Sequence, residues 1–182
     1  GARADAGQIG RFGNLNPTDG GRTRRSSLSG EWSTRDGGGW TRLNAYAIDY
    51  SLDLWSDFSF CLNDMALTGS CQRGDQFHQA DRRKVYGLDV AHSGFGALAG
   101  RPADLTLGVQ VRHDRIDRVA LSLSSARQDY LAIRNDKVAQ SSIGLFGEAQ
   151  VQWHDKFRSI VGVRSDHYHF DVGSSLAQNS GR

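Results

Sequence analysis

The sequence predicts an all-β fold: an antiparallel, up-and-down transmembrane β-barrel to which this chain contributes about six long strands. Apolar and polar side chains alternate with a period of two over long segments, which is typical of strands that have one apolar and one polar face. The connections between these segments alternate between short and long, as in barrels with short turns at one rim and long loops at the other. No run of 18 apolar residues is present, which excludes a transmembrane helix.

The alternation is clearest in residues 104–114 and 138–153. In the first segment, Leu105, Leu107, Val109 and Val111 share one side, and Thr106, Gly108, Gln110 and Arg112 share the other. In the second, one side carries Ile143, Leu145, Ala149, Val151 and Trp153. The small residues Gly144 and Gly147 mark places where this strand can bend or pack closely.

The N-terminal third of the chain predicts a loop and then two strands. Residues 1–22 are rich in Gly, also contain Asn and Asp, and include the turn cluster Pro17-Thr-Asp-Gly-Gly21, so they predict a loop. In residues 24–34 the apolar Leu28 and Trp32 alternate with serine and glutamate, and a run of three glycines after Asp36 predicts a tight turn. In residues 40–55, one side carries Tyr46, Ile48, Tyr50, Leu52 and Leu54, and the other carries Ala47, Asp49, Ser51 and Asp53.

The remaining elements follow from the same pattern. The complete set of predicted strands comprises residues 24–34, 40–55, 79–93, 104–114, 138–153 and 157–172. Residues 94–102 and 154–156 predict short connections, and residues 173–182 begin another loop. The polar segments 56–78 and 117–137 predict the two long loops, and we expect ligand specificity to lie in them. In such a barrel, the apolar sides of the strands face lipid and the charged sides face the lumen.

Several aromatic residues fall at or near the ends of the predicted strands, where interfacial girdles belong in a membrane barrel. They are Trp32, Trp40, Trp55, Trp153, Phe157, Tyr168 and Phe170. Six strands cannot close a barrel with an apolar outer face, and open edges in lipid would leave backbone groups unpaired. We therefore expect residues 1–182 to be part of a longer barrel. The absence of an initiator methionine and of a signal sequence favours the same interpretation, with a mature processed domain as the alternative.

Net charge and cysteine content restrict the possible partners and the cellular compartment of the protein. The net charge is only +2 and basic residues are interspersed with acidic ones, which argues against nucleic acid as a partner. Cys61 and Cys71 are the only cysteines, and we expect them to form a disulfide in an oxidising compartment rather than two free thiols or a zinc site. Closing a loop of this size would stabilise the fold by roughly 3 kcal/mol.

Five segments of the chain resemble the barrel of TonB-dependent outer-membrane receptors. They begin with Arg11-Phe-Gly-Asn-Leu-Asn-Pro-Thr-Asp-Gly-Gly21 followed by Ser26-Ser-Leu-Ser-Gly-Glu-Trp32, and continue with Asn44-Ala-Tyr-Ala-Ile-Asp-Tyr-Ser-Leu-Asp-Leu-Trp55 and Gly74-Asp-Gln-Phe-His-Gln-Ala-Asp-Arg-Arg83. The last, Val161-Gly-Val-Arg-Ser-Asp-His-Tyr-His-Phe-Asp-Val172, is similar to the family's recurrent Gly-x-Arg-x-Asp-x-Tyr strand. The resemblance implies a middle section of a 22-stranded barrel in the outer membrane of a Gram-negative bacterium.

The resemblance also implies a function. Such receptors take up siderophore-like or other large solutes, with energy from an inner-membrane TonB complex that acts through a plug domain, and they are surrounded by outer-membrane lipid and lipopolysaccharide. No plug segment and no TonB box are recognisable in residues 1–182. A passive porin-type channel and a soluble all-β ligand-binding module are the alternatives. The soluble module predicts that the apolar sides of the strands meet in one dry core.

No set of residues indicates an enzyme, a cofactor or a metal. No serine lies in a Gly-x-Ser-x-Gly turn, so a nucleophile is not predicted. Asp49 and Asp53, with Glu31 on a neighbouring strand, could act as paired carboxylates, but lumen-lining charge is the preferred interpretation. His167 and His169, with Asp166 and Asp171, could hold a metal, but in a strand Asp166 points away from the two histidines, and polar strand-end residues are the preferred interpretation.

Overall fold

In the computed structural model, six long antiparallel strands form a single sheet. The structure describes residues 5–7, 10, 13–14 and 16–181. The strands are β1 (Gly20–Asp36), β2 (Gly39–Asp57), β3 (Gln76–Leu98), β4 (Arg101–Ser125), β5 (Gln128–His154) and β6 (Phe157–Ser174). A short helix, α2 (Leu62–Thr68), lies between β2 and β3, and a 3₁₀ turn, η1 (Ala177–Asn179), follows β6.

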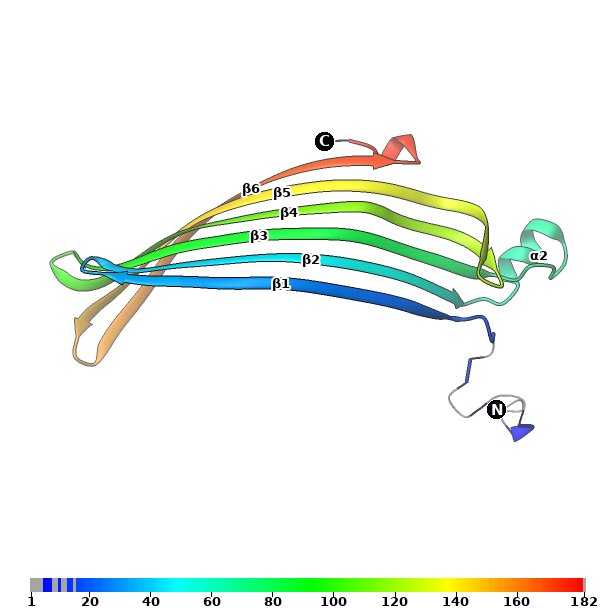
Figure 1. Cartoon of the computed structure of the whole chain (residues 1–182), viewed down its shortest axis with the longest axis horizontal. Coiled ribbons are helices and arrows are strands. Elements are labelled where there is room, and N and C mark those ends of the chain that lie inside the picture. The colour runs from blue at the N-terminus through cyan, green and yellow to red at the C-terminus, as the bar shows by residue number, and fades with distance from the viewer. Residues whose placement is uncertain (1–4, 8–9, 11–12, 15, 182) are drawn as a thin grey trace.

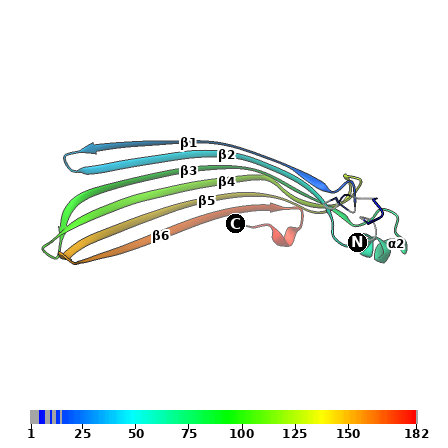
Figure 2. The ribbon, with the colours of Figure 1, turned by 90° about the horizontal axis from the view of Figure 1, so that it is seen from below.

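The strands follow one another in the sheet in the order β1-β2-β3-β4-β5-β6, and each neighbouring pair is antiparallel. This order is the up-and-down topology that the sequence predicts. The sheet is curved and twisted, as Figures 1 and 2 show from two directions. It is not closed: within the described residues, β1 and β6 form its two edges, and only an isolated bridge between Val172 and Gly181 adds to the β6 edge.

The register assigns the side chains to two faces, because directly paired residues of antiparallel strands point to the same side. One face, here called the belt face, carries a continuous apolar band. Its members include Leu28, Trp32, Leu43, Tyr86, Leu88, Val90, Leu105, Leu107, Val109, Val111, Ile143, Leu145, Val161 and Val163. The opposite face, here called the polar face, carries Glu31, Asn44, Asp89, Gln110, Arg112, Gln140, Glu148, Arg164 and Asp166.

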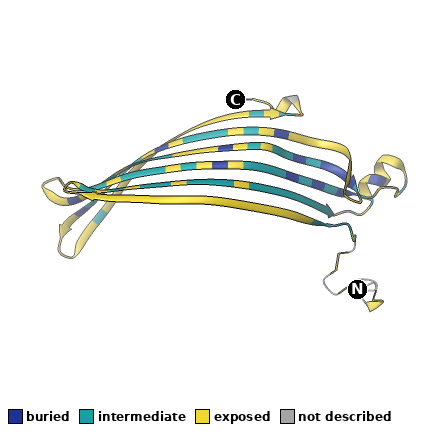
Figure 3. Cartoon of the chain, in the orientation of Figure 1, coloured by how far each residue is buried: buried dark blue, intermediate teal, exposed yellow. Residues whose placement is uncertain are grey.

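The apolar band is open to its surroundings. Leu28 on β1, Leu107 on β4 and Val163 on β6 are exposed by 77%, 70% and 75%. Exposure is most continuous along the edge strands β1 and β6 in Figure 3. Val151, which is paired with Ala103 and Ser159, is an exception and is buried. Within the described residues, the contacts between strands are those between neighbours in the sheet, and no second layer packs on the band. The dry core that a soluble module requires is therefore not formed.

The length of the band along the strands can be compared with the height of a lipid-facing belt. It runs from Leu105 to Val111 on β4, about 20 Å at 3.4 Å per residue, and from Ile143 to Val151 on β5, about 27 Å on the same scale. Strands in outer-membrane barrels are tilted by about 35–45°, so these lengths correspond to roughly 16 and 21 Å of height, somewhat below the apolar height of about 25 Å in such barrels. Within the described part of the chain, no helix has both the length and the apolar character to cross a membrane.

The prediction of a long loop over residues 117–137 is wrong. β4 continues to Ser125, β5 starts at Gln128, and only Ala126 and Arg127 connect them. Both connecting residues have positive φ angles, 48° and 68°, which is the backbone of a two-residue type I′ hairpin. Sequence reasoning missed this turn because Asn-Gly or Asp-Gly is its usual signal, whereas the chain has Ala-Arg. Irregular pairing around Ile116, Leu121 and Leu123 also breaks the alternation that would have revealed a strand.

Two other boundaries differ from the prediction. Residues 94–102 are not a loop: β3 extends to Leu98 and β4 begins at Arg101, with a two-residue turn between them. The long connection predicted at 56–78 is shorter, because β2 reaches Asp57 and β3 starts at Gln76. The predicted loop over residues 1–22 and the family-like segment that starts at Arg11 lie partly outside the described residues.

Side-chain direction in β2 also corrects the sequence interpretation. Tyr46, Ile48, Tyr50, Leu52 and Leu54 share a side as predicted, but it is the polar face, while Leu43, Ala45 and Ala47 belong to the apolar band. The aromatic girdle is only partly formed on the belt face. Trp32 and Trp153 lie there, Trp40, Tyr168 and Phe170 lie on the polar face, and Trp55 lies on the belt face but well beyond the band.

Candidate functional site

The two segments predicted to bind ligand meet at one end of the sheet. This distal end, defined as residues 16–19, 57–78 and 123–131, comprises the turn before β1, the connection containing α2, and the tip of the β4–β5 hairpin (Figure 1). Arg73 of the connection lies over the ring of Tyr130 of the hairpin, with its guanidinium carbon 5.0 Å from the ring centre. The opposite, proximal end consists of three tight turns at residues 37–38, 99–100 and 155–156.

One disulfide and the hydrogen bonds of two buried aspartates hold the connection between β2 and β3 together. Cys61 and Cys71 are joined, with Cα atoms 5.4 Å apart. Asp75 accepts hydrogen bonds from the backbone amides of Asn63 and Asp64, which have no acceptor within the helix because they lie in the first turn of α2. It also accepts a hydrogen bond from the hydroxyl of Ser59. Asp64 in turn accepts hydrogen bonds from three successive backbone amides, those of residues 72–74. The segment is therefore a braced unit rather than an open loop.

Gln76 ties the hairpin tip to the rest of the distal end. Its side chain is buried, and its Nε2 donates to Thr18 Oγ1 at 2.9 Å and to Asp19 Oδ1 at 3.0 Å. Its Oε1 accepts from the backbone amide of Arg127 at 3.0 Å and from Ser124 Oγ at 3.2 Å. One side chain thus joins the turn before β1, the start of β3 and the tip of the hairpin.

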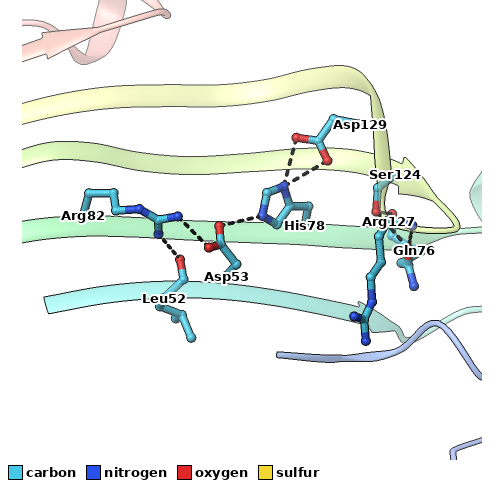
Figure 4. A network of polar contacts seen from close by, with 8 residues as sticks. All are labelled: Leu52, Asp53, Gln76, His78, Arg82, Ser124, Arg127 and Asp129. Atoms are coloured by element: carbon cyan, nitrogen blue, oxygen red, sulfur yellow. Dashed lines mark hydrogen bonds and ion pairs between the residues drawn. The ribbon is translucent and has the colours of Figure 1, made fainter. Parts of the chain in front are cut away.

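A second polar network lies beside the first, on the belt face beyond the apolar band (Figure 4). His78 contacts two carboxylates: its Nδ1 lies 2.9 Å from Asp129 on the hairpin, and its Nε2 lies 3.2 Å from Asp53 on β2. The imidazole also stacks on Trp55, with ring centres 4.4 Å apart. Arg82 pairs with Asp53 and donates to the carbonyl of Leu52. The network holds β5 to β3 and β2.

Hydrogen bonds keep the carboxylates of the distal end ionised. Burial alone would raise the pKa of Asp53, but hydrogen bonds from Arg82 and His78 outweigh it and lower the pKa below its ordinary value. The backbone amide of Arg73 makes the largest contribution to the lowered pKa of Asp64. Burial also opposes ionisation of Asp75, yet hydrogen bonds from Ser59, Asn63 and Asp64 leave its pKa below the ordinary value.

The polar face of the sheet forms a charged wall below the distal end. Arg112 binds Asp114 two residues along β4, and Arg164 binds Asp166 two residues along β6. Arg164 also donates to Gln110 across the sheet at 2.7 Å. Gln110, Arg112, Arg164 and Asp166 border a hollow of about 430 Å³, whose lining also includes Tyr46, Asp89, Gln140, Ser142 and Tyr168. The Arg-x-Asp spacing recurs because residues two apart on a strand share a face.

The other candidate residues are not brought together. Asp49 and Asp53 lie on the belt face whereas Glu31 lies on the polar face, so the three carboxylates do not converge and do not line one lumen wall. His167 and His169 share a face and Asp166 lies on the opposite one. Among the residues that the structure describes, no group of three or more His, Cys, Asp or Glu side chains has the arrangement of a metal site.

The sequence did not identify the residues that build the distal end. Gln76, His78, Arg127 and Asp129 carry most of its long-range contacts. Gln76 and His78 lie in the family-like segment Gly74–Arg83, but that resemblance assigns them no contacts, and Arg127 and Asp129 lie in no recognisable motif. Their partners are 48 to 58 residues away in most cases, so no local spacing reveals them. The one usable signal in the sequence is that Asp64 lies within and Asp75 lies just after the Cys61–Cys71 segment, where carboxylates can accept hydrogen bonds from backbone amides.

The comparisons with known proteins agree with this geometry. A family model described as "TonB dependent receptor-like, beta-barrel" matches residues 1–182, the entire chain. No significant match is found among curated proteins or among solved structures.

Proposed function

We propose that this chain, which belongs to the TonB-dependent receptor-like β-barrel family, forms part of the wall of an outer-membrane transporter. The transported molecule would be a siderophore-like or other large solute. The family consists of outer-membrane transporters rather than enzymes. The observation that carries the proposal is the division of one sheet into an exposed apolar band and a charged opposite wall. A barrel needs this division, with lipid on one side and a polar lumen on the other.

The open edges of the sheet support its completion by further strands. An unpaired strand edge in hydrocarbon costs several kcal/mol for each backbone group that lacks a partner. Within the described residues, β1 and β6 each have one such edge along the band. We therefore interpret residues 1–182 as a section of a larger barrel, of 22 strands if it follows the family pattern. A plug domain elsewhere in the protein would fill the lumen and connect it to the inner-membrane TonB complex.

The distal end is the proposed site of ligand capture. It is the end with the long connection, which in outer-membrane barrels faces the exterior. It combines a rigid disulfide-braced segment with exposed aromatic and aliphatic side chains: Phe58 is exposed by 71% and Leu62 by 71%. Apolar side chains displayed on a braced scaffold suit a large solute, because little conformational entropy is lost on binding.

Uptake measurements test the proposal directly. Cells with the gene intact, with the gene deleted, and with the TonB complex inactivated would each receive a panel of radiolabelled ferric siderophores and other large solutes. We expect at least one solute to accumulate only when both the gene and the TonB complex are intact. Accumulation that requires the gene but not the TonB complex would replace the proposal with the passive channel. If no solute larger than the porin cut-off depends on the gene, the transport role is wrong.

A further inference from the structure

Basic side chains form two adjacent rows on the belt face, immediately beyond the distal edge of the apolar band. In the first row, Ser26, Asp49, Lys84 and Arg115 are directly paired across β1 to β4. In the next row, Arg24, Ser51, Arg82 and Arg118 are directly paired across the same four strands. On β3, Lys84 lies two residues beyond Tyr86 of the band, which is about 7 Å along a strand. The cationic rows are defined here as Arg24, Arg82, Lys84, Arg115 and Arg118.

The pairing within these rows places like charges opposite one another. Lys84 faces Arg115, and Arg82 faces Arg118, on neighbouring strands of the same face. Directly opposed like charges destabilise a sheet unless something of opposite charge lies between them. Two members have such a partner in the protein, because Arg82 pairs with Asp53 and Arg115 pairs with Asp117.

The other three members are not neutralised. Among the described residues, Arg24, Lys84 and Arg118 form no ion pair, although Asp49 is the cross-strand neighbour of Lys84. The Nε of Arg118 is buried and has no hydrogen-bond partner within the protein. A buried donor without an acceptor is unfavourable, and a guanidinium donor is well matched to an oxyanion. The rows therefore have unused capacity for negative charge.

We propose that the cationic rows bind the phosphate groups of anionic lipids in the outer leaflet, with the acyl chains lying on the apolar band. This inference rests on the proposed function, because it requires the band to be immersed in lipid. The position of the rows selects a lipid over a free anion: the basic side chains lie where headgroups meet the apolar band, and their aliphatic stems can extend along it. Basic clusters at this depth recognise lipid phosphates in other membrane proteins.

The experiment compares lipid binding by the intact protein with binding by a variant that lacks two unpaired charges. Native mass spectrometry in detergent would measure the affinity for diphosphorylated lipid A and for its dephosphorylated form. The test variant is Lys84→Gln with Arg118→Gln. The matched control is Lys156→Gln with Arg158→Gln, which removes the same charge at the proximal turn after β5. Each basic residue near an anionic lipid surface contributes about fivefold in affinity, so we expect about a 25-fold loss in the test variant.

The relative affinities for the two forms of lipid A decide whether the cationic rows bind lipid phosphates. It is supported if the phosphorylated lipid binds the unmodified protein more tightly than the dephosphorylated form, the test variant loses this preference, and the control stays within about twofold. Equal affinities for the two lipids, or equal losses in test and control variants, overturn it. Inorganic phosphate that displaces the lipid at equal concentration also overturns it, because the site would then be one for a free anion.

Two further measurements keep the result interpretable. If the test variant does not fold, the variant Lys84→Arg with Arg118→Lys replaces it. This variant keeps both charges and is expected to bind the lipid as the unmodified protein does. In addition, lipid binding by the unmodified protein must weaken with added salt. Solute uptake by the same variants separates this inference from the proposed function. Lipid preference without uptake contradicts only the transport role, whereas uptake without lipid preference contradicts only the cationic rows.

Discussion

At the scale of single residues, aromatic rings on the polar face lie across glycines of the adjacent strand. Tyr46 of β2 covers Gly87 of β3, and Phe146 of β5 covers Gly108 of β4. A Cβ atom at Gly87 would lie 2.2 Å from the Tyr46 ring, and one at Gly108 would lie 2.2 Å from the Phe146 ring. These glycines are required by close packing rather than by backbone conformation, since neither has a positive φ angle.

A substitution at Gly87 tests this packing. We expect Gly87→Val to displace the Tyr46 ring and to destabilise the sheet by about 1–3 kcal/mol, the usual cost of overpacking. Gly30→Val is the control, because a Cβ at Gly30 has nothing within 4 Å. Urea unfolding of the refolded protein, followed by tryptophan fluorescence, would give both values. Equal midpoints for the two variants would contradict the packing role of Gly87.

The carboxylates of the distal end make its stability dependent on pH. The pKa values of Asp53, Asp64 and Asp75 are all lowered from the ordinary 3.8. Near that pH the unfolded segment binds more protons than the folded one, so the stabilisation is present above the ordinary pKa and is lost as the pH falls through the lower folded values. We expect residues 59–75 to become less protected below roughly pH 4, measured by hydrogen exchange corrected for the intrinsic effect of pH.

Asp75→Asn provides the control for that measurement. The side-chain amide has the same shape but does not titrate, and it offers one acceptor oxygen where Asp75 uses both, so one of the α2 amides loses its acceptor. The segment should therefore be less protected at neutral pH and should change less on acidification. A variant that shows the same pH profile as the unmodified protein would exclude Asp75 as a source of the effect.

At the scale of elements, the sequence predicts strands well where one face must be apolar and poorly where it need not be. Residues 104–114 and 138–153 alternate because lipid or lumen on either side selects each residue. Beyond the band both faces are polar or mixed, as at His78 and Arg82, and the alternation that defines a strand disappears. The distal halves of β4 and β5 are strands through pairing with their neighbours, and the sequence-based interpretation as a loop failed for this reason.

The distal position of the β4–β5 hairpin depends on Gln76. Replacing it with alanine removes the acceptor for Arg127 and Ser124 and the donor for Thr18 and Asp19. We expect Gln76→Ala to destabilise the local structure by about 1–3 kcal/mol and to raise hydrogen exchange at residues 124–131. Gln79→Ala is the control, because Gln79 lies on the opposite face and makes no side-chain hydrogen bond with a described residue. Unchanged exchange in the Gln76 variant would show that other contacts hold the hairpin.

At the scale of the whole molecule, hydropathy patterning predicts the class of fold but not the face of the sheet to which the apolar side of each strand points. The apolar side of residues 105–111 faces the band as expected, whereas the apolar side of β2 from Tyr46 to Leu54 faces the charged wall. Register decides this, because Tyr46 is directly paired with Gly87 and fills the space that the glycine leaves. Pairing partners lie far apart in the sequence, so a single strand read alone does not reveal its orientation.

The central claim is that lipid meets the belt face and water meets the polar face. Single cysteines at Leu107 and Leu145 on one face, and at Gln110 and Glu148 on the other, can carry nitroxide spin labels in the full protein reconstituted into bilayers. We predict that labels at Leu107 and Leu145 collide preferentially with oxygen, which concentrates in lipid, and that labels at Gln110 and Glu148 collide preferentially with a water-soluble nickel chelate. Labels at Leu107 and Leu145 that favour the nickel chelate would contradict the membrane assignment and the transport role together.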